Sequence, residues 1–155
     1  MEHQIFSLAN LLAMLGWVLL AMFPRRRWAM LASGSVIPGL LASAYVVIIA
    51  AAWGRTPGGF STLSAVGQLF DSSWMLLAGW LHYLAFDLFV GSWIVRDARE
   101  RRIPHPWLLP LLVLTFLFGP AGWLSYLGLR ALTRGRDTSP AAPRRAPGET
   151  PSVLG

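Results

Sequence analysis

WMLLAGWLHYLAFDLFVGSWIV, residues 74–95, is a nearly unbroken apolar run with one acidic residue, Asp87, close to its middle. About 20 apolar residues in a helix cross the roughly 30 Å hydrocarbon core of a bilayer, so the run has the length of a transmembrane helix. A carboxylate at such a depth costs roughly 2.5 to 3.5 kcal/mol. Asp87 is therefore a candidate functional residue.

Composition extends this interpretation to the whole chain. Only 13% of its 155 residues are charged and 55% are hydrophobic, whereas soluble domains carry about 25% charged residues. Because a spanning segment must satisfy its own backbone polar groups, the long apolar runs predict an all-α integral membrane protein. The predicted four-helix transmembrane bundle fills residues 1–134, with helices at about residues 5–23, 28–53, 74–95 and 107–130. Residues 135–155 are rich in Pro, Gly, Ser and Arg and predict a disordered tail.

All thirteen basic residues are arginines, which give the chain a net charge of +6. They lie in short connectors and in the tail, which is typical of membrane topology and anionic head groups rather than of nucleic-acid binding. The positive-inside rule predicts cytoplasmic connectors at residues 24–27 and 96–106. The N-terminus and the loop at residues 54–73, with a short interfacial helix, are then outside. The basic flanks and the lack of a plastid-like leader predict a multi-pass protein of a bacterial inner membrane.

The tail conflicts with four crossings, which would place it outside although it carries Arg130, Arg134, Arg136, Arg144 and Arg145. Either the rule is weakly obeyed, or the fourth segment doubles back at Gly119-Pro120, where proline removes a backbone donor. We favour four full crossings with a kink at this point. A second kink is expected at Pro38, where it would leave space for a ligand.

The polar groups of residues 74–95 indicate where chemistry would occur. His82 and Asp87 are five residues apart, or about 140° around a helix, so they would flank one ligand from different sides. Tyr83 and Asp87 share a face, and a hydrogen bond between them would hold the carboxyl. The alternative is a structural Asp87 that stays protonated and bonds to another helix.

Candidate ligand-binding residues come from several segments: Tyr83, Asn10, Tyr45, Trp80, Asp97 and His105. Asn10 and Tyr45 are expected partners for the polar groups of the 74–95 segment, because buried amides and hydroxyls need hydrogen-bond partners in lipid. Asp97 lies about 15 Å from Asp87 along a helix, so the two cannot form a dyad. A salt bridge to the arginines that follow Asp97 is expected instead. The histidines and aspartates lack the tight spacing of a metal motif, so no metal site is predicted.

Two stretches, GWLHYLAFDLFVGSWIVRDARERRIPH at residues 79–105 and LTFLFGPAGWLSYL at residues 114–127, carry a family resemblance. From Asn10 to Arg130 the chain resembles the membrane proteins related to the plant abscisic-acid-deficient type needed for neoxanthin synthesis, represented in bacteria by a domain of unknown function. The resemblance implies carotenoid chemistry, in which an epoxide of violaxanthin opens and a neighbouring C–H is lost to give an allene. Such an isomerisation uses a general acid and a base and no redox cofactor. We assign the acid to Asp87 and the base to His82.

Three classes of function follow. The first is a membrane protein that binds a polyene or isoprenoid lipid and catalyses or assists its isomerisation. The second is a non-catalytic binding or scaffold protein for other membrane enzymes, with Asp87 as a contact between helices. The third is a small proton-linked transporter, in which four helices would have to oligomerise to line a path. The expected partners are an apolar, carotenoid-like ligand, the membrane, and further copies or partner membrane enzymes, but not nucleic acid.

Overall fold

The computed structural model describes residues 1–134, which form helices and their connectors. The predicted tail at residues 135–155 lies outside the described residues. In chain order the elements are α1 (Glu2–Met22), α2 (Arg27–Leu31), the π-helical segment η1 (Ala32–Val36), α3 (Ile37–Ala52), α4 (Leu63–Phe70), α5 (Ser73–Glu100), the 3-10 turn η2 (His105–Trp107), α6 (Leu109–Phe118) and α7 (Pro120–Arg134). The predicted all-α class is confirmed.

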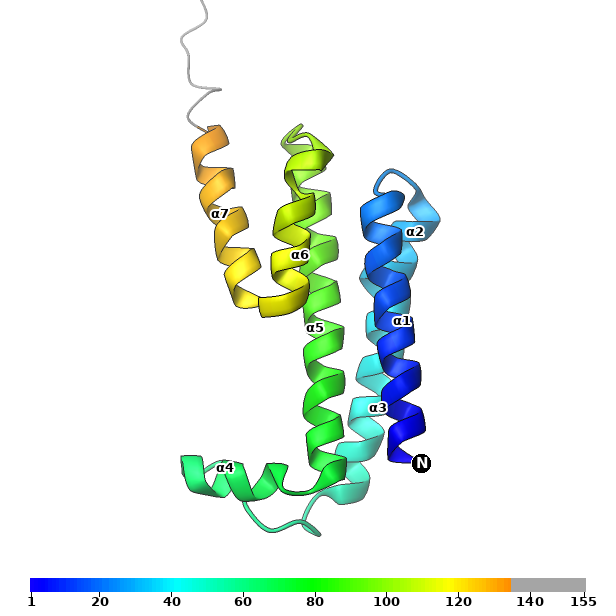
Figure 1. Cartoon of the computed structure of the whole chain (residues 1–155), viewed down its shortest axis with the longest axis vertical. Helices are drawn as coiled ribbons and strands as arrows, with labels where there is room; N and C mark the ends of the chain where they lie inside the picture. The colour runs from blue at the N-terminus through cyan, green and yellow to red at the C-terminus, as the bar shows by residue number, and fades with distance from the viewer. Residues whose placement is uncertain (135–155) are drawn as a thin grey trace, which may run out of the picture.

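Three helical segments are long and apolar enough to cross a membrane: Glu2–Met22, Arg27–Ala52 and Ser73–Glu100, of 21, 26 and 28 residues. At a rise of about 1.5 Å per residue, each reaches the roughly 30 Å that a crossing requires. They run side by side, and α5 packs against both α1 and α3 (Figure 1). Because α5 also contacts α4, α6 and α7, it is the central helix of the fold.

Small residues let these helices approach closely. Gly16 of α1 lies against Leu88 of α5, and Gly91 of α5 lies against the ring of Trp17. A methyl group on Gly91 would be 2.6 Å from a carbon of the Trp17 indole, which is far inside van der Waals contact. The buried hydroxyl of Ser33 donates a hydrogen bond to the carbonyl of Gly16 across 2.9 Å. Close packing and interhelical hydrogen bonds of this kind hold helices together in lipid, where the hydrophobic effect between them is absent.

The irregularity expected at Pro38 takes the form of the π-helical segment η1, which ends two residues before it. Proline has no N–H for the carbonyl four residues earlier, and its ring crowds that carbonyl. The wider π turn accommodates the mismatch. Beside it lies a hollow of about 400 Å³, lined by Pro38 and by Phe86 and Phe89 of α5 among others. The space expected at Pro38 is therefore present.

The segment predicted as a fourth crossing, residues 107–130, is not one helix, and this prediction was wrong. Gly119, with φ +35°, ends α6, and Pro120 begins α7. The chain then doubles back, so that α7 runs beside α6 (Figure 1). A methyl group on Gly122 would lie 2.3 Å from the backbone nitrogen of Thr115, which shows how closely the two helices approach. The 10 residues of α6 extend about 15 Å, half the thickness of the hydrocarbon core.

The reversal of the chain at Gly119 resolves the conflict between the predicted number of crossings and the distribution of the arginines. The N-terminus lies at one end of the molecule, and the C-terminal end of α7 lies at the opposite end, with the α1–α2 connector and the end of α5 (Figure 1). We call this second end the arginine-rich end, since it holds the arginines of the α1–α2 connector and of the end of α5, together with Arg130 of α7, whose Nε lies 3.5 Å from Asp97. With three candidate spans and a hairpin that folds back, α7 ends at the same end of the molecule as the arginine-rich connectors, which is the arrangement that the positive-inside rule favours.

The predicted short helix within residues 54–73 is confirmed as α4. Its N-terminus is capped by Thr62, whose hydroxyl accepts a hydrogen bond from the amide of Ala65 at 3.1 Å. α4 projects sideways from the start of α5, on the side away from α1 (Figure 1). The placement of this helix along the membrane surface stays a prediction.

Candidate functional site

The tip of the α6–α7 hairpin meets the middle of α5 at Asp87 (Figure 1). Asp87 is 9% exposed, and its carboxyl lies against Gly119, where an added methyl group would be 2.6 Å from Oδ1 and 3.1 Å from Oδ2. The left-handed φ and the lack of space both require glycine at this position. Asp87 thus sits where the chain reverses at mid-depth.

The Oδ2 atom of Asp87 is buried and has no hydrogen-bond partner among the described residues. Neither ion pair of the described chain involves it. A buried carboxylate without a partner is costly, which favours the acid form that carries a proton. The arrangement is one that can hold a proton and release it to a group placed beside the hairpin tip.

Tyr83 lies one turn before Asp87 on the same face of α5. Its hydroxyl donates to the carbonyl of Phe116 at 2.8 Å, with the carbonyl of Leu117 at 3.2 Å. These carbonyls belong to the last turn of α6, where no intrahelical donor remains. The α5 helix therefore offers a hydroxyl donor to the C-terminal end of α6 and places the Asp87 carboxyl at the start of α7. The sequence placed both residues on one face but could not show that α6 engages the hydroxyl.

His82 faces a different direction. Its side chain is exposed, and its ring stacks on Phe86 at 4.6 Å between centroids. The ring of Tyr45 from α3 lies 5.7 Å away. The structure brings His82 and Tyr45 together on the α3 side of α5, and it does not bring His82 to the carboxyl of Asp87. A ligand that contacted both His82 and Asp87 would have to pass around the helix.

Asn10 and Trp80 form a second polar contact between α1 and α5. The indole N–H of Trp80 donates to Oδ1 of Asn10 across 3.1 Å, and the Asn10 amide donates to the carbonyl of Phe6 at 2.8 Å. The expectation that Asn10 partners a polar group of the third segment is confirmed. The Trp80 ring also packs between Phe6 and Tyr83, at 5.7 and 5.3 Å. This contact joins α1 to the face of α5 that carries Tyr83.

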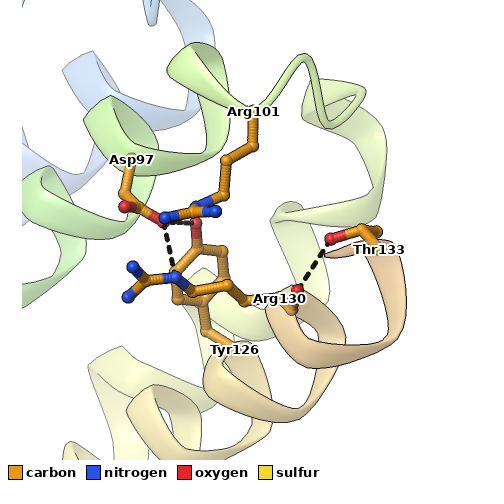
Figure 2. A network of polar contacts seen from close by, with 5 residues as sticks. All are labelled: Asp97, Arg101, Tyr126, Arg130 and Thr133. Atoms are coloured by element: carbon orange, nitrogen blue, oxygen red, sulfur yellow. Dashed lines mark hydrogen bonds and ion pairs between the residues drawn. The ribbon is translucent and has the colours of Figure 1, made fainter. Parts of the chain in front are cut away.

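Asp97 is the centre of a polar network that joins α5 to α7 (Figure 2). Its Oδ2 atom accepts a hydrogen bond from Nε of Arg101 at 2.7 Å and from the hydroxyl of Tyr126 at 2.5 Å, with Nε of Arg130 at 3.5 Å. The expected salt bridge to a following arginine is confirmed, and the hydrogen bond to Asp97 raises the pKa of Arg101. Arg130 also lies over the ring of Trp93, 5.9 Å from its centroid.

Sequence reasoning missed Tyr126 and Arg130 because it read residues 107–130 as one crossing. A hairpin turn at Gly119 carries α7 back along α5, which brings Tyr126 to the level of Asp97 (Figure 2). The signal was present in the dipeptide Gly119-Pro120, since glycine commonly ends a helix and proline commonly begins one. His105, the remaining candidate, bonds through Nε2 to the carbonyl of Ala21 at 3.0 Å and so ties η2 to the end of α1.

An apolar groove runs between α1 and α6. It has a volume of about 400 Å³ and is lined by Trp17, Val18, Leu112 and Phe116, among others. Trp17 packs on Gly91, one turn beyond Asp87 on α5, and the carbonyl of Phe116 receives the Tyr83 hydroxyl. The groove therefore ends close to the residues that surround the hairpin tip.

Comparison with known proteins gives one match. A family model described as ABA DEFICIENT 4-like matches residues 4–126. No curated protein and no solved structure matches the chain. The matched range includes α1 from residue 4, the other two candidate spans, α6, and α7 as far as Tyr126.

Proposed function

Because the chain belongs to the ABA DEFICIENT 4-like family, we propose that it is a membrane protein of carotenoid metabolism that isomerises a polyene or related isoprenoid lipid without a redox cofactor. The observation that carries this proposal is the buried Oδ2 atom of Asp87, which has no partner in the described residues, at the tip of the re-entrant hairpin. A polyene would lie in the apolar groove between α1 and α6, which ends near this tip.

The proposed reaction converts an epoxide into an isomeric hydroxyl compound. The protonated Asp87 donates its proton to the epoxide oxygen as the C–O bond breaks. The C–H bond beside the opened carbon then breaks, its electron pair forms the new C=C bond, and its proton passes to the carboxylate. The carboxyl ends as it began, so atoms and charges balance and no cofactor is consumed. Because His82 faces α3, Asp87 can serve in both steps, and the earlier assignment of His82 as base remains a separate proposal.

The test is product formation by Asp87 variants in a host that makes epoxy-carotenoids and lacks the endogenous protein. Asp87→Asn keeps the shape and hydrogen-bonding capacity of the side chain but transfers no proton near neutral pH, so we expect a loss of roughly 100-fold or more. Asp71→Asn, at an exposed acid beyond α4, is the matched control and should retain wild-type product formation. Full product formation by Asp87→Asn at equal protein yield would rule out the acid role.

A second candidate is a non-catalytic binding or scaffold protein, which the contact between Asp87 and Gly119 favours. In that case the carboxyl serves to seat the hairpin on α5. Asp87→Asn would then behave as wild type, and Asp87→Leu would lower protein yield by crowding Gly119. Pigment that co-purifies with Asp87→Asn but stays unconverted would instead support the catalytic proposal, because binding would survive while proton transfer would not.

A further inference from the structure

A small basic cavity lies at the arginine-rich end, between the α1–α2 connector and the segment that follows α5. It has a volume of about 330 Å³, and its lining includes Arg25, Arg99, Arg102 and His105. No acidic residue lines it. Within residues 1–134, the ion pairs involve only Arg101 and Arg130, so the three lining arginines have no carboxylate partner there. Three cations around one hollow repel one another unless an anion joins them.

The walls of the cavity are held in place by hydrogen bonds to the end of α1. Nη1 of Arg99 donates to the carbonyl of Pro24 across 3.1 Å. Nε2 of His105 bonds to the carbonyl of Ala21 at 3.0 Å. The Ala21 carbonyl belongs to the last turn of α1, where no intrahelical donor remains, and the Pro24 carbonyl belongs to the α1–α2 connector. The two bonds therefore fix the connector and the end of α1 against the end of α5 and the segment after it. The side chains of Arg99 and His105 are thus held in position before any ligand arrives.

Arg102 has a backbone conformation that its side chain does not favour. The end of α5 is closed by two hydrogen bonds, from the Ile103 amide to the Ala98 carbonyl at 2.9 Å and from the Arg102 amide to the Arg99 carbonyl at 3.1 Å. This is the Schellman pattern, in which the residue at the position of Arg102 is usually glycine. Arg102 is the one non-glycine residue of the described chain with a positive φ, +57°. An arginine held in this disfavoured conformation points to a use for its side chain.

The depth of the cavity identifies the class of ligand. Two exposed tryptophans lie near this cavity: Trp28 packs against Phe23 just after α1, and Trp107 lines a neighbouring hollow with Arg101 and Arg102. Such rings mark the head-group level of a membrane. Guanidinium groups bind phosphate oxygens through paired, charge-assisted hydrogen bonds. We propose that Arg25, Arg99 and Arg102, with His105, bind the phosphate group of an anionic membrane lipid. This site is separate from the hairpin tip and does not depend on the proposed function.

The proposal is tested with the full-length protein in mild detergent, with thermal unfolding followed by tryptophan fluorescence. Phosphatidylglycerol should raise the unfolding temperature of the wild type, and phosphatidylcholine, which has no net charge, should raise it much less. Arg102→Gly relieves the left-handed backbone, so without lipid it should be at least as stable as the wild type. Arg25→Gln is the second variant. Both should bind phosphatidylglycerol about tenfold more weakly, the loss of one charge-assisted interaction.

Arg26→Gln is the matched control, because it removes the same charge from the neighbouring residue, which does not line the cavity. It should respond to phosphatidylglycerol as the wild type does. If Arg26→Gln weakens phosphatidylglycerol binding as much as Arg25→Gln does, the lipid is held by diffuse attraction to the arginines and the proposal is overturned. An equal rise in unfolding temperature with the two lipids would also overturn it. A parallel measurement with inorganic phosphate distinguishes a lipid head group from a soluble phosphate as the ligand. If inorganic phosphate stabilises the wild type but not Arg102→Gly, and phosphatidylglycerol does not, the site binds phosphate but its ligand is a soluble anion. If neither phosphatidylglycerol nor inorganic phosphate raises the unfolding temperature, the proposed site is overturned.

Discussion

The hydroxyl of Tyr126 donates a hydrogen bond to Oδ2 of Asp97 across 2.5 Å, and this contact fastens the returning arm of the hairpin to the central helix (Figure 2). Tyr126 is fully buried, and its ring packs edge-on against Trp93 at 5.8 Å. The hairpin is thus held at two levels on α5. Asp97 holds α7 near the arginine-rich end, and Tyr83 and Asp87 contact the turn at its tip.

Removing the Tyr126 hydroxyl should loosen the hairpin without removing any packing. We expect Tyr126→Phe to lower the free energy of unfolding by about 1.5 to 3 kcal/mol, the range for a hydrogen bond to a charged group. The measurement is unfolding of the purified protein by titration with a denaturing detergent. Ser125→Ala is the control, since the Ser125 hydroxyl bonds only within its own helix, to Ala121 at 2.8 Å. Equal stability of Tyr126→Phe and Ser125→Ala would contradict a fastening role.

Substitution of Gly119 should disrupt the hairpin tip. Alanine there would adopt a strained backbone and place a methyl group 2.6 Å from Oδ1 of Asp87, so we expect a loss of about 2 to 5 kcal/mol. Gly128→Ala is the control, because a methyl group at this position of α7 would meet no other atom within 4 Å. We expect it to leave the free energy of unfolding unchanged or slightly raised. The same detergent titration compares the two. The double variant Gly119→Ala/Asp87→Ala should recover part of the stability lost in Gly119→Ala. If it recovers none, the Asp87 carboxyl is not the group that the added methyl crowds.

The contact between Asn10 and Trp80 should couple α1 to α5. A double-mutant cycle with Asn10→Ala and Trp80→Phe should give a coupling free energy of about 0.6 kcal/mol, the average for hydrogen bonds between membrane helices. Both residues sit near the apolar surface, where a missing partner is not replaced by water. Strict additivity of the two substitutions would show that the 3.1 Å contact contributes nothing to stability.

The three candidate spans and the returning α6–α7 hairpin make a prediction about which side of the membrane each connector faces. The chain has no cysteine, so single cysteines report position without background. A cysteine at Arg26 and one added after Gly155 should be labelled from the same side of the membrane, and a cysteine at Ser61 from the opposite side. The reagent is a membrane-impermeant maleimide, applied to intact and to opened cells. Labelling of the C-terminal cysteine from the side of Ser61 would restore the four-crossing topology.

The spans of this protein follow from local chemistry. Long apolar runs bounded by tryptophan and arginine can only be helices in lipid, so the sequence predicted the segments around Ala13, Leu41 and Leu84 without reference to any contact. The buried acid at Asp87 and its shared face with Tyr83 also follow from residue type and helical periodicity. The salt bridge of Asp97 was readable for the same reason, because its arginine lies four residues away on one helix.

The course of the chain after Pro120 was decided by tertiary contacts. Gly119-Pro120 permits either a kinked crossing or a reversal, since both remove the same backbone hydrogen bond. The close approach of Gly122 to Thr115 lets α7 pack beside α6. The reversal is then selected by contacts between residues far apart in the sequence, the Tyr83 hydroxyl on the end of α6 and Tyr126 on Asp97. The direction of His82, away from Asp87 and toward Tyr45, likewise depends on which helices pack on each side of α5. Periodicity sets the angle between two side chains on a helix, but only the packed neighbours determine what each side chain meets.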